Sequence, residues 1–143
     1  MKILILLIVL LLAGCNQKPI WAEVNLQIIA QIESSNNPSA YNKSSGAVGL
    51  YQITTICLED YNQLNKRQYA LNEMFDPNKA YIVANWYMNK RILQLLKHYK
   101  LPDNLSNRLW CYNAGIGQCK KGVLPTETRN YILKYIRLDK MED

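Results

Sequence analysis

The segment IAQIESSNNP, residues 29–38, predicts the end of a helix that carries a single carboxylate. Apolar residues recur at helical spacing from Val24 to Ile32, which places Glu33 at the edge of the buried stripe. Asn37-Pro38 ends the helix, because proline cannot continue it. Burial disfavours an ionised carboxyl, so Glu33 is a candidate general acid near neutral pH. The competing interpretation is an ordinary surface glutamate at a helix C-terminus.

The next informative stretch is SGAVGLYQ, residues 45–52. Gly46 and Gly49 lack a Cβ and permit a tight bend or a close approach of backbone to a ligand. Ser45 and Gln52 supply neutral hydrogen-bonding groups beside them. A surface turn without function is the alternative.

Several groups of residues resemble, in order, the motifs of the SLT-type lytic transglycosylases. They are Glu33-Ser34 with Pro38, Ser45-Gly46-Ala47, Gly49-Leu50 with Gln52, Phe75-Asp76-Pro77, Tyr112-Asn113-Ala114-Gly115, Leu124-Pro125, Glu127-Thr128-Arg129 and Tyr131. Separated motifs in the right order are more specific than any one alone. The resemblance runs from Val24 to Arg137 and implies an all-α, lysozyme-like transglycosylase domain.

The resemblance also implies a reaction that needs one carboxylate, whereas most glycosidases use two. Glu33 would protonate the glycosidic oxygen between N-acetylmuramic acid and N-acetylglucosamine in peptidoglycan. It would then take the proton of the C6 hydroxyl, which closes a 1,6-anhydro ring without water. Ser45, Gln52 and Tyr112 match the family's substrate-binding residues. Asn113 is a further candidate, with helix capping as the alternative, and no cofactor is implied.

The chain departs from the family pattern at three places. Tyr51 stands where methionine is common, Cys111 stands where alanine is common, and residues 54–57 lack the usual proline. These departures leave the acid in place and bear on substrate preference.

Two other functions remain open at this point. A lysozyme-type muramidase would require Asp60, Asp76 or Glu59 to activate a water molecule. A wall-binding accessory protein would keep the cleft without turnover.

The first residues predict export. An apolar run from Ile3 to Leu12 follows a short basic start and is too short to span a bilayer, which takes about 20 residues. Leu12-Ala13-Gly14-Cys15 resembles the lipobox of bacterial lipoproteins, so Cys15 is predicted to be acylated. An ordinary signal peptide cut nearby is the alternative.

The predicted organisation is a signal peptide at 1–14, a tether at 15–22 and one domain at 23–143. The residue directly after Cys15 is Asn16, whereas an aspartate at this position commonly retains lipoproteins in the inner membrane. The expectation is a protein on the periplasmic side, anchored to the outer membrane by lipid.

If acylation uses the Cys15 thiol, three cysteines remain in a compartment that is expected to be oxidising. Cys111 and Cys119 flank a glycine-containing loop and are the natural disulfide pair, which leaves Cys57 as a buried thiol. All three could instead be small apolar core residues. No metal site is predicted, because His98 is the only histidine and no ligand spacing surrounds it.

Length and composition fit a single compact domain. The chain has 143 residues, is 49% hydrophobic and carries a net charge of +6. Its lysines and arginines are scattered, so nucleic acid is not an expected partner, and a wall polymer with carboxylate-bearing peptides suits the balance. The sequence leaves open whether secretion, conjugation or wall-remodelling machinery is a further partner.

Periodicity and turn residues predict helices and no strand. The expected helices cover about 23–35, 51–72, 81–99, 105–113 and 125–137. The third would be a long scaffold helix that begins after Asp76-Pro77 and stops before Pro102.

Overall fold

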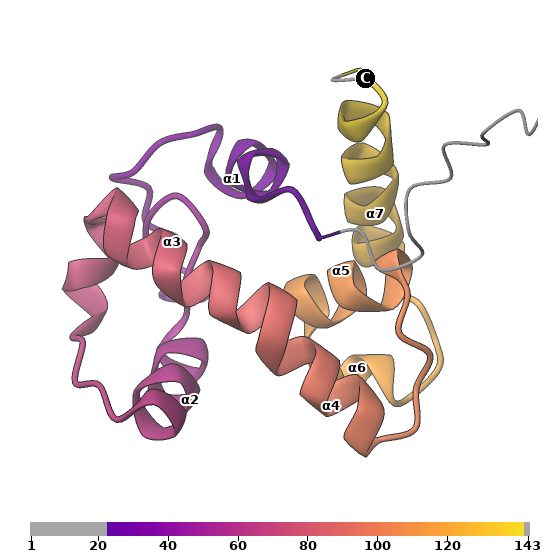
Figure 1. The fold of residues 1–143 in the computed structure, drawn as a ribbon. Helices are drawn as coiled ribbons and strands as arrows, with labels where there is room; N and C mark the ends of the chain where they lie inside the picture. The colour runs from indigo at the N-terminus through magenta and orange to yellow at the C-terminus, as the bar shows by residue number, and fades with distance from the viewer. Residues whose placement is uncertain (1–22, 142–143) are drawn as a thin grey trace, which may run out of the picture.

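The computed structural model describes residues 23–141, and these are mainly helical, which confirms the expected all-α class. The predicted signal peptide, the acylated Cys15 and the tether lie outside the described residues. Figure 1 shows the helices in chain order. They are α1 (Leu26–Ser34), α2 (Thr55–Asn65), η1 (Leu71–Phe75), α3 (Pro77–Trp86), η2 (Tyr87–Arg91), α4 (Ile92–His98), α5 (Leu105–Ala114), α6 (Ile116–Cys119) and α7 (Thr126–Asp139). Within residues 23–141 no helix is both long and apolar enough to cross a membrane.

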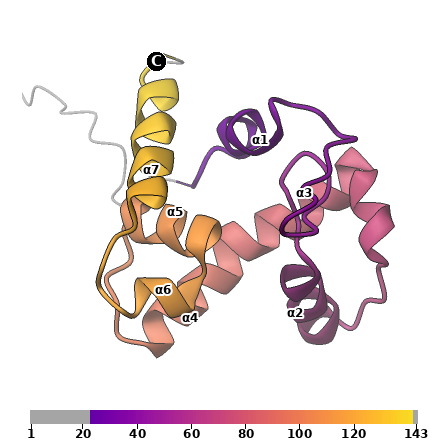
Figure 2. The ribbon, with the colours of Figure 1, turned by 180° about the vertical axis from the view of Figure 1, so that it is seen from behind.

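The expected scaffold helix is present as the continuous run of α3, η2 and α4, which crosses the molecule diagonally in Figures 1 and 2. Asp76 begins it, because its carboxylate accepts hydrogen bonds from the backbone of Asn78 and Lys79, and Pro77 occupies the first turn. The sequence did not predict that η2, in the middle of the run, is π-helical. One side of the run is wholly buried: Ala80, Val83, Ala84, Met88, Ile92 and Leu96. This stripe is the centre of the core.

Other helices pack near the two ends of this run. In both ribbon views α2 and η1 lie near the α3 end, while α5 and α6 lie near the α4 end. Helix α7 packs against both α5 and α1, and the Tyr135 hydroxyl accepts a hydrogen bond of 2.8 Å from the backbone nitrogen of Asn25. The first and last helices of the domain are therefore joined through direct contacts.

Helix α2 begins at Thr55, later than the expected start near Tyr51. The reason lies in the turn before it, where Val48 bridges both Tyr41 and Ile53 and where Gln52 adopts a left-handed conformation, with φ of 49°. Thr54 then caps the helix, because its hydroxyl accepts from the backbone nitrogen of Cys57. Residues 51–54 therefore belong to a loop and not to the first turn of α2.

Gly49 fixes the position of this loop. Its φ is +77°, and a Cβ at this position would lie 2.1 Å from the carbonyl oxygen of Met74 in η1. Only glycine permits this approach of the two backbones. Gly46, in the same loop, has a φ of +71° but no atom within 4 Å of its hypothetical Cβ.

We expect Gly49→Ala to destabilise the domain by more than about 3 kcal/mol, because backbone strain and a clash with Met74 add together. Gly46→Ala is the matched control and should cost only about 1–2 kcal/mol of strain. Urea unfolding of the two variants measures both values. Equal losses in the two variants would show that contact with η1 does not constrain the loop.

Candidate active site

Glu33 lies in the last turn of α1, where the helix ends in a left-handed residue, Ser35. The neighbouring Ser34 hydroxyl lies 2.9 Å from the carbonyl oxygen of Leu50 and 3.1 Å from that of Ala30, so it can donate to either. It also accepts from the backbone nitrogen of Asn37. Ser34 therefore ties the end of α1 to the loop that carries Gln52, a role that the sequence motif alone did not reveal.

The Glu33 carboxyl is largely, but not wholly, removed from water. Burial raises the pKa of Glu33 to about 7, while the Tyr131 hydroxyl and the Lys134 ammonium group act in the opposite direction. Both of these side chains come from α7, which packs against α1. The predicted position of Glu33 at the edge of the buried stripe is confirmed.

Two phenol groups from different helices surround this carboxyl. Burial and the nearby Glu33 charge raise the pKa of Tyr112, from α5, and of Tyr131, from α7, well above the usual tyrosine value. The Tyr131 hydroxyl is buried, and it approaches Glu33 without meeting the geometry of a full hydrogen bond to any described residue. A carboxyl and two neutral phenols therefore meet where three helices converge.

A cavity of about 220 Å³ adjoins this group through Tyr112. Gln52, Tyr112 and Asn113, three of the four predicted binding residues, line it together. Ser45, the fourth, is exposed and lies outside the lining, with its hydroxyl accepting from the backbone nitrogen of Ala47. The other lining residues are Ile53, Thr54, Ile56, Cys57, Tyr87, Cys111 and Gly115. The sequence predicted Gln52, Tyr112 and Asn113 as binding residues from separate motifs. The tertiary structure places all three in the lining of one cavity.

Hydrogen bonds fix the polar groups of this cavity. The Gln52 side-chain nitrogen donates to the Gly49 carbonyl oxygen at 3.1 Å. The Tyr112 hydroxyl donates to the Tyr51 carbonyl oxygen at 2.9 Å. Because its proton is used in this bond, the hydroxyl can act toward a ligand only as an acceptor. These bonds hold the lining in place before any ligand binds.

Asn113 is held by Thr128, which the sequence identified only as part of the Glu127-Thr128-Arg129 motif. The buried Thr128 hydroxyl donates to the Asn113 side-chain oxygen at 2.8 Å. The end of α5 is capped instead by Gly115, whose nitrogen bonds to the Cys111 carbonyl oxygen. Asn113 therefore does not cap α5 in this structure, and its NH₂ group is left as a hydrogen-bond donor in the lining of the cavity.

Among the described residues, no carboxylate lines this cavity. Asp60 forms an ion pair with Arg91 at 2.6 Å, and Asp76 caps α3. Glu59 is exposed on α2. Within residues 23–141 no three histidine, cysteine, aspartate or glutamate side chains are grouped so that they could hold a metal ion.

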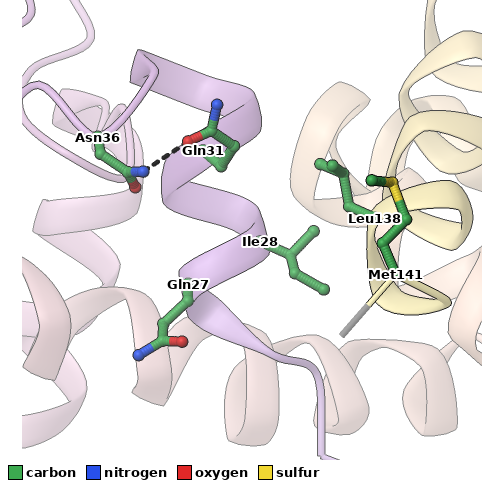
Figure 3. Close-up of a pocket in the computed structure, with 6 residues that line it drawn as sticks. All are labelled: Gln27, Ile28, Gln31, Asn36, Leu138 and Met141. Atoms are coloured by element: carbon green, nitrogen blue, oxygen red, sulfur yellow. Dashed lines mark hydrogen bonds between the residues drawn. The ribbon is translucent and has the colours of Figure 1, made fainter. Parts of the chain in front are cut away.

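A larger hollow of about 440 Å³ lies between α1 and the end of α7, and Figure 3 shows its lining. Gln27, Ile28 and Gln31 form its α1 side, and Leu138 and Met141 form its α7 side. At 100° per residue these α1 positions lie on faces of the helix well away from that of Glu33. This hollow is therefore separate from the site of the buried carboxyl.

The three described cysteines carry free thiols in this structure. Cys111 and Cys119 lie beside each other, and burial together with the Cys119 thiol raises the pKa of Cys111. Burial also raises the pKa of Cys57, which lines the cavity, to about 12. The predicted disulfide remains a prediction, and these positions are compatible with it.

The arrangement defines a class: a small helical domain with one partly buried acid beside a cavity lined by neutral hydrogen-bonding groups. A family model, the transglycosylase SLT domain, matches residues 14–133. The chain belongs to this family. Membership supports a function on peptidoglycan like that of lytic transglycosylases. No curated protein and no solved structure matches the chain.

We expect the exported protein to contain a Cys111–Cys119 disulfide, because the two thiols adjoin and export supplies an oxidant. Peptide mapping under non-reducing conditions detects it. Reduction should lower the free energy of unfolding by about 2–3 kcal/mol, which is the loop-closure effect for so short a ring. It should also loosen the cavity more than the core. Three free thiols, or a bond to Cys57, would refute the pairing.

Glu33→Gln should stabilise the folded protein at pH 8 but not at pH 4. Unfolded Glu33 ionises near its ordinary pKa of 4.5 and folded Glu33 near a pKa of about 7, so the folded state binds more protons between these values. The free energy of unfolding therefore falls as pH rises through this window, by on the order of 3 kcal/mol, and the variant lacks this loss.

The measurement is the difference in unfolding free energy between variant and wild type at several pH values. Glu59→Gln removes an exposed carboxylate of α2 and is the control. A Glu33→Gln difference that stays constant from pH 4 to pH 8 would contradict the raised pKa.

Proposed function

We propose that this protein is a lytic transglycosylase that cleaves the β-1,4 bond between N-acetylmuramic acid and N-acetylglucosamine in peptidoglycan. One observation carries the proposal: in a chain of the SLT family, burial raises the pKa of a single carboxyl, Glu33, to about 7 beside a cavity of neutral donors and acceptors. A general acid and base works best when its pKa lies near the working pH.

Protonated Glu33 donates its proton to the glycosidic oxygen, and the bond from that oxygen to C1 of N-acetylmuramic acid breaks. The positive charge that develops at C1 is shared with the ring oxygen or with the substrate's own N-acetyl oxygen. The Glu33 carboxylate then accepts the C6 hydroxyl proton while O6 bonds to C1. Glu33 regains its proton, the product is a 1,6-anhydro sugar, and no water is consumed.

The surrounding groups suit both halves of this cycle. Burial keeps Glu33 protonated before bond cleavage, while the Tyr131 hydroxyl and Lys134 stabilise the carboxylate that cleavage produces. Gln52, Tyr112 and Asn113 are fixed by their own hydrogen bonds and can hold the acetamido group and sugar hydroxyls.

The positions of the other carboxylates favour this reaction over hydrolysis. A muramidase of the inverting or two-carboxylate type needs a second acidic group near the scissile bond. Asp60 is engaged by Arg91, Asp76 caps a helix and Glu59 is exposed on α2. The raised pKa of Glu33 likewise favours catalysis over a purely wall-binding role, because binding alone does not require a costly buried acid.

Replacing Glu33 with glutamine should reduce release of soluble fragments from purified sacculi by about 10²–10⁴-fold, because size is kept and the transferable proton is lost. Wild-type release should also decline as pH rises past 7, where Glu33 is ionised. Glu59→Gln, which removes an exposed carboxylate, should retain full activity.

Mass spectrometry of the released muropeptides identifies the reaction. Anhydro ends are expected, whereas reducing ends alone would identify a muramidase. Wild-type protein that binds sacculi and releases nothing would identify a wall-binding accessory protein. Near-native turnover by folded Glu33→Gln would exclude Glu33 as the acid.

We also propose that Cys15 is acylated and holds the protein to the outer membrane on its periplasmic side. The lipobox-like Leu12-Ala13-Gly14-Cys15 supports this location. Cys15→Ala should leave the protein unprocessed or free of membranes, as fractionation would show. Failure of the wild-type protein to incorporate labelled fatty acid would refute the anchor.

A further inference from the structure

A second groove lies along α3, away from the cavity of Gln52 and Tyr112. It consists of two hollows of about 320 and 440 Å³ that share Glu23, Tyr81 and Asn85 in their linings. One hollow extends toward the start of α1 and Tyr51, and the other extends along α3 to Asn89 and Lys90. The two hollows adjoin at these shared residues, and we call them together the α3 groove.

Helical spacing arranges the central residues of the α3 groove in a row. Tyr81, Asn85 and Asn89 occur four residues apart on one face of α3 and η2, and they span about 12 Å. The Tyr81 side chain is half exposed, at 49%. A row of one aromatic ring and two amides offers both a flat apolar face and directed hydrogen bonds.

Hydrogen bonds hold the side-chain amides of Asn85 and Asn89 in place and leave one hydrogen-bonding group of Asn85 unoccupied. The Asn89 side-chain nitrogen donates to the Asn85 side-chain oxygen at 2.9 Å, and the Asn89 side-chain oxygen accepts from the backbone of Val24. The Asn85 NH₂ group makes no hydrogen bond to the described residues and lies in the lining of both hollows. It is available to a ligand.

The charge of the α3 groove is balanced. Among the described residues and apart from tyrosines, the ionisable residues of its lining are Glu23 and Lys90, one acidic and one basic. Tyr61 and Trp86 add aromatic surface, and Asn65 adds a further amide. This lining suits a neutral polymer that carries hydroxyl and acetamido groups, and it offers no cluster of cations for a polyanion.

Tyr51, one of the departures from the family pattern, belongs to this groove. Its ring lines the α3 groove and packs edge-to-face on Tyr81, with centroids 6.3 Å apart. Its carbonyl oxygen accepts the hydrogen bond from the Tyr112 hydroxyl of the cavity. The residue therefore supports the groove with its side chain and the cavity with its backbone.

We propose that the α3 groove binds a stretch of β-1,4-linked N-acetylhexosamine glycan outside the catalytic cavity, with Tyr81 stacking on a sugar ring and Asn85 donating to an acetamido or hydroxyl oxygen. The choice of a wall glycan as the ligand rests on the proposed function. Such a site holds the enzyme on its polymer while the cavity acts on another segment, which raises the local concentration of cleavable bonds.

The test is a titration of ¹⁵N-labelled Glu33→Gln protein with a short soluble β-1,4-linked N-acetylglucosamine oligomer, followed by NMR. The expected result is two groups of shifted signals: Gln52 and Asn113 in the cavity, and the side-chain amides of Asn85 and Asn89 in the α3 groove. Each group yields its own affinity.

Two added substitutions test the α3 groove by different chemistry. Tyr81→Ala removes the exposed ring, and Asn85→Asp keeps the acceptor for Asn89 while removing the free donor. Each should weaken groove binding roughly tenfold or more and leave the cavity affinity unchanged, which also shows that the fold is intact. Tyr99→Ala, at the end of α4 and outside the lining of both hollows, is the matched control.

Shifts confined to the cavity would overturn the proposal, as would groove shifts that Tyr81→Ala and Asn85→Asp leave unaltered. A free wall stem peptide that shifts the groove signals when the oligomer does not would overturn the glycan assignment. None of these outcomes depends on turnover, so the analysis of anhydro ends tests the proposed function separately.

Discussion

A carboxyl group withdrawn from water at the end of a short helix is the constraint on which the site depends. Ionising Glu33 in place costs free energy, so the surrounding groups must either keep the proton on it or compensate its charge. The structure does both in part: burial raises the pKa to about 7, and Tyr131 with Lys134 limits the rise. A group balanced near neutrality can give up a proton and take one back, which a surface glutamate cannot do as readily.

Holding the carboxyl there requires contacts between segments far apart in the chain. Ser34 joins the end of α1 to the loop at Leu50, and Gly49 lets that loop contact the backbone of η1. Tyr112 joins α5 to the same loop through the Tyr51 carbonyl oxygen. The loop between α1 and α2 is thus fixed from several directions, so its polar groups need little rearrangement when a ligand binds.

The site has a cost in stability that the rest of the fold must offset. A buried acid that ionises near pH 7 destabilises the folded state above that pH, and the free energy of folding is small to begin with. The wholly buried stripe along α3, η2 and α4 supplies much of the compensating apolar burial.

The sequence by itself determined the features that depend on local chemistry: the end of α1 just after Glu33, the start of the long helix at Asp76-Pro77, and the glycines of the 45–52 loop. Each follows from periodicity, capping or backbone freedom within a few residues. Only the tertiary structure decided which side chains meet. It paired Thr128 with Asn113, brought Tyr131 to Glu33, left Ser45 outside the cavity and turned the Tyr51 ring toward Tyr81. Such contacts depend on how helices pack, and packing is settled by the whole core at once, so no local pattern encodes them.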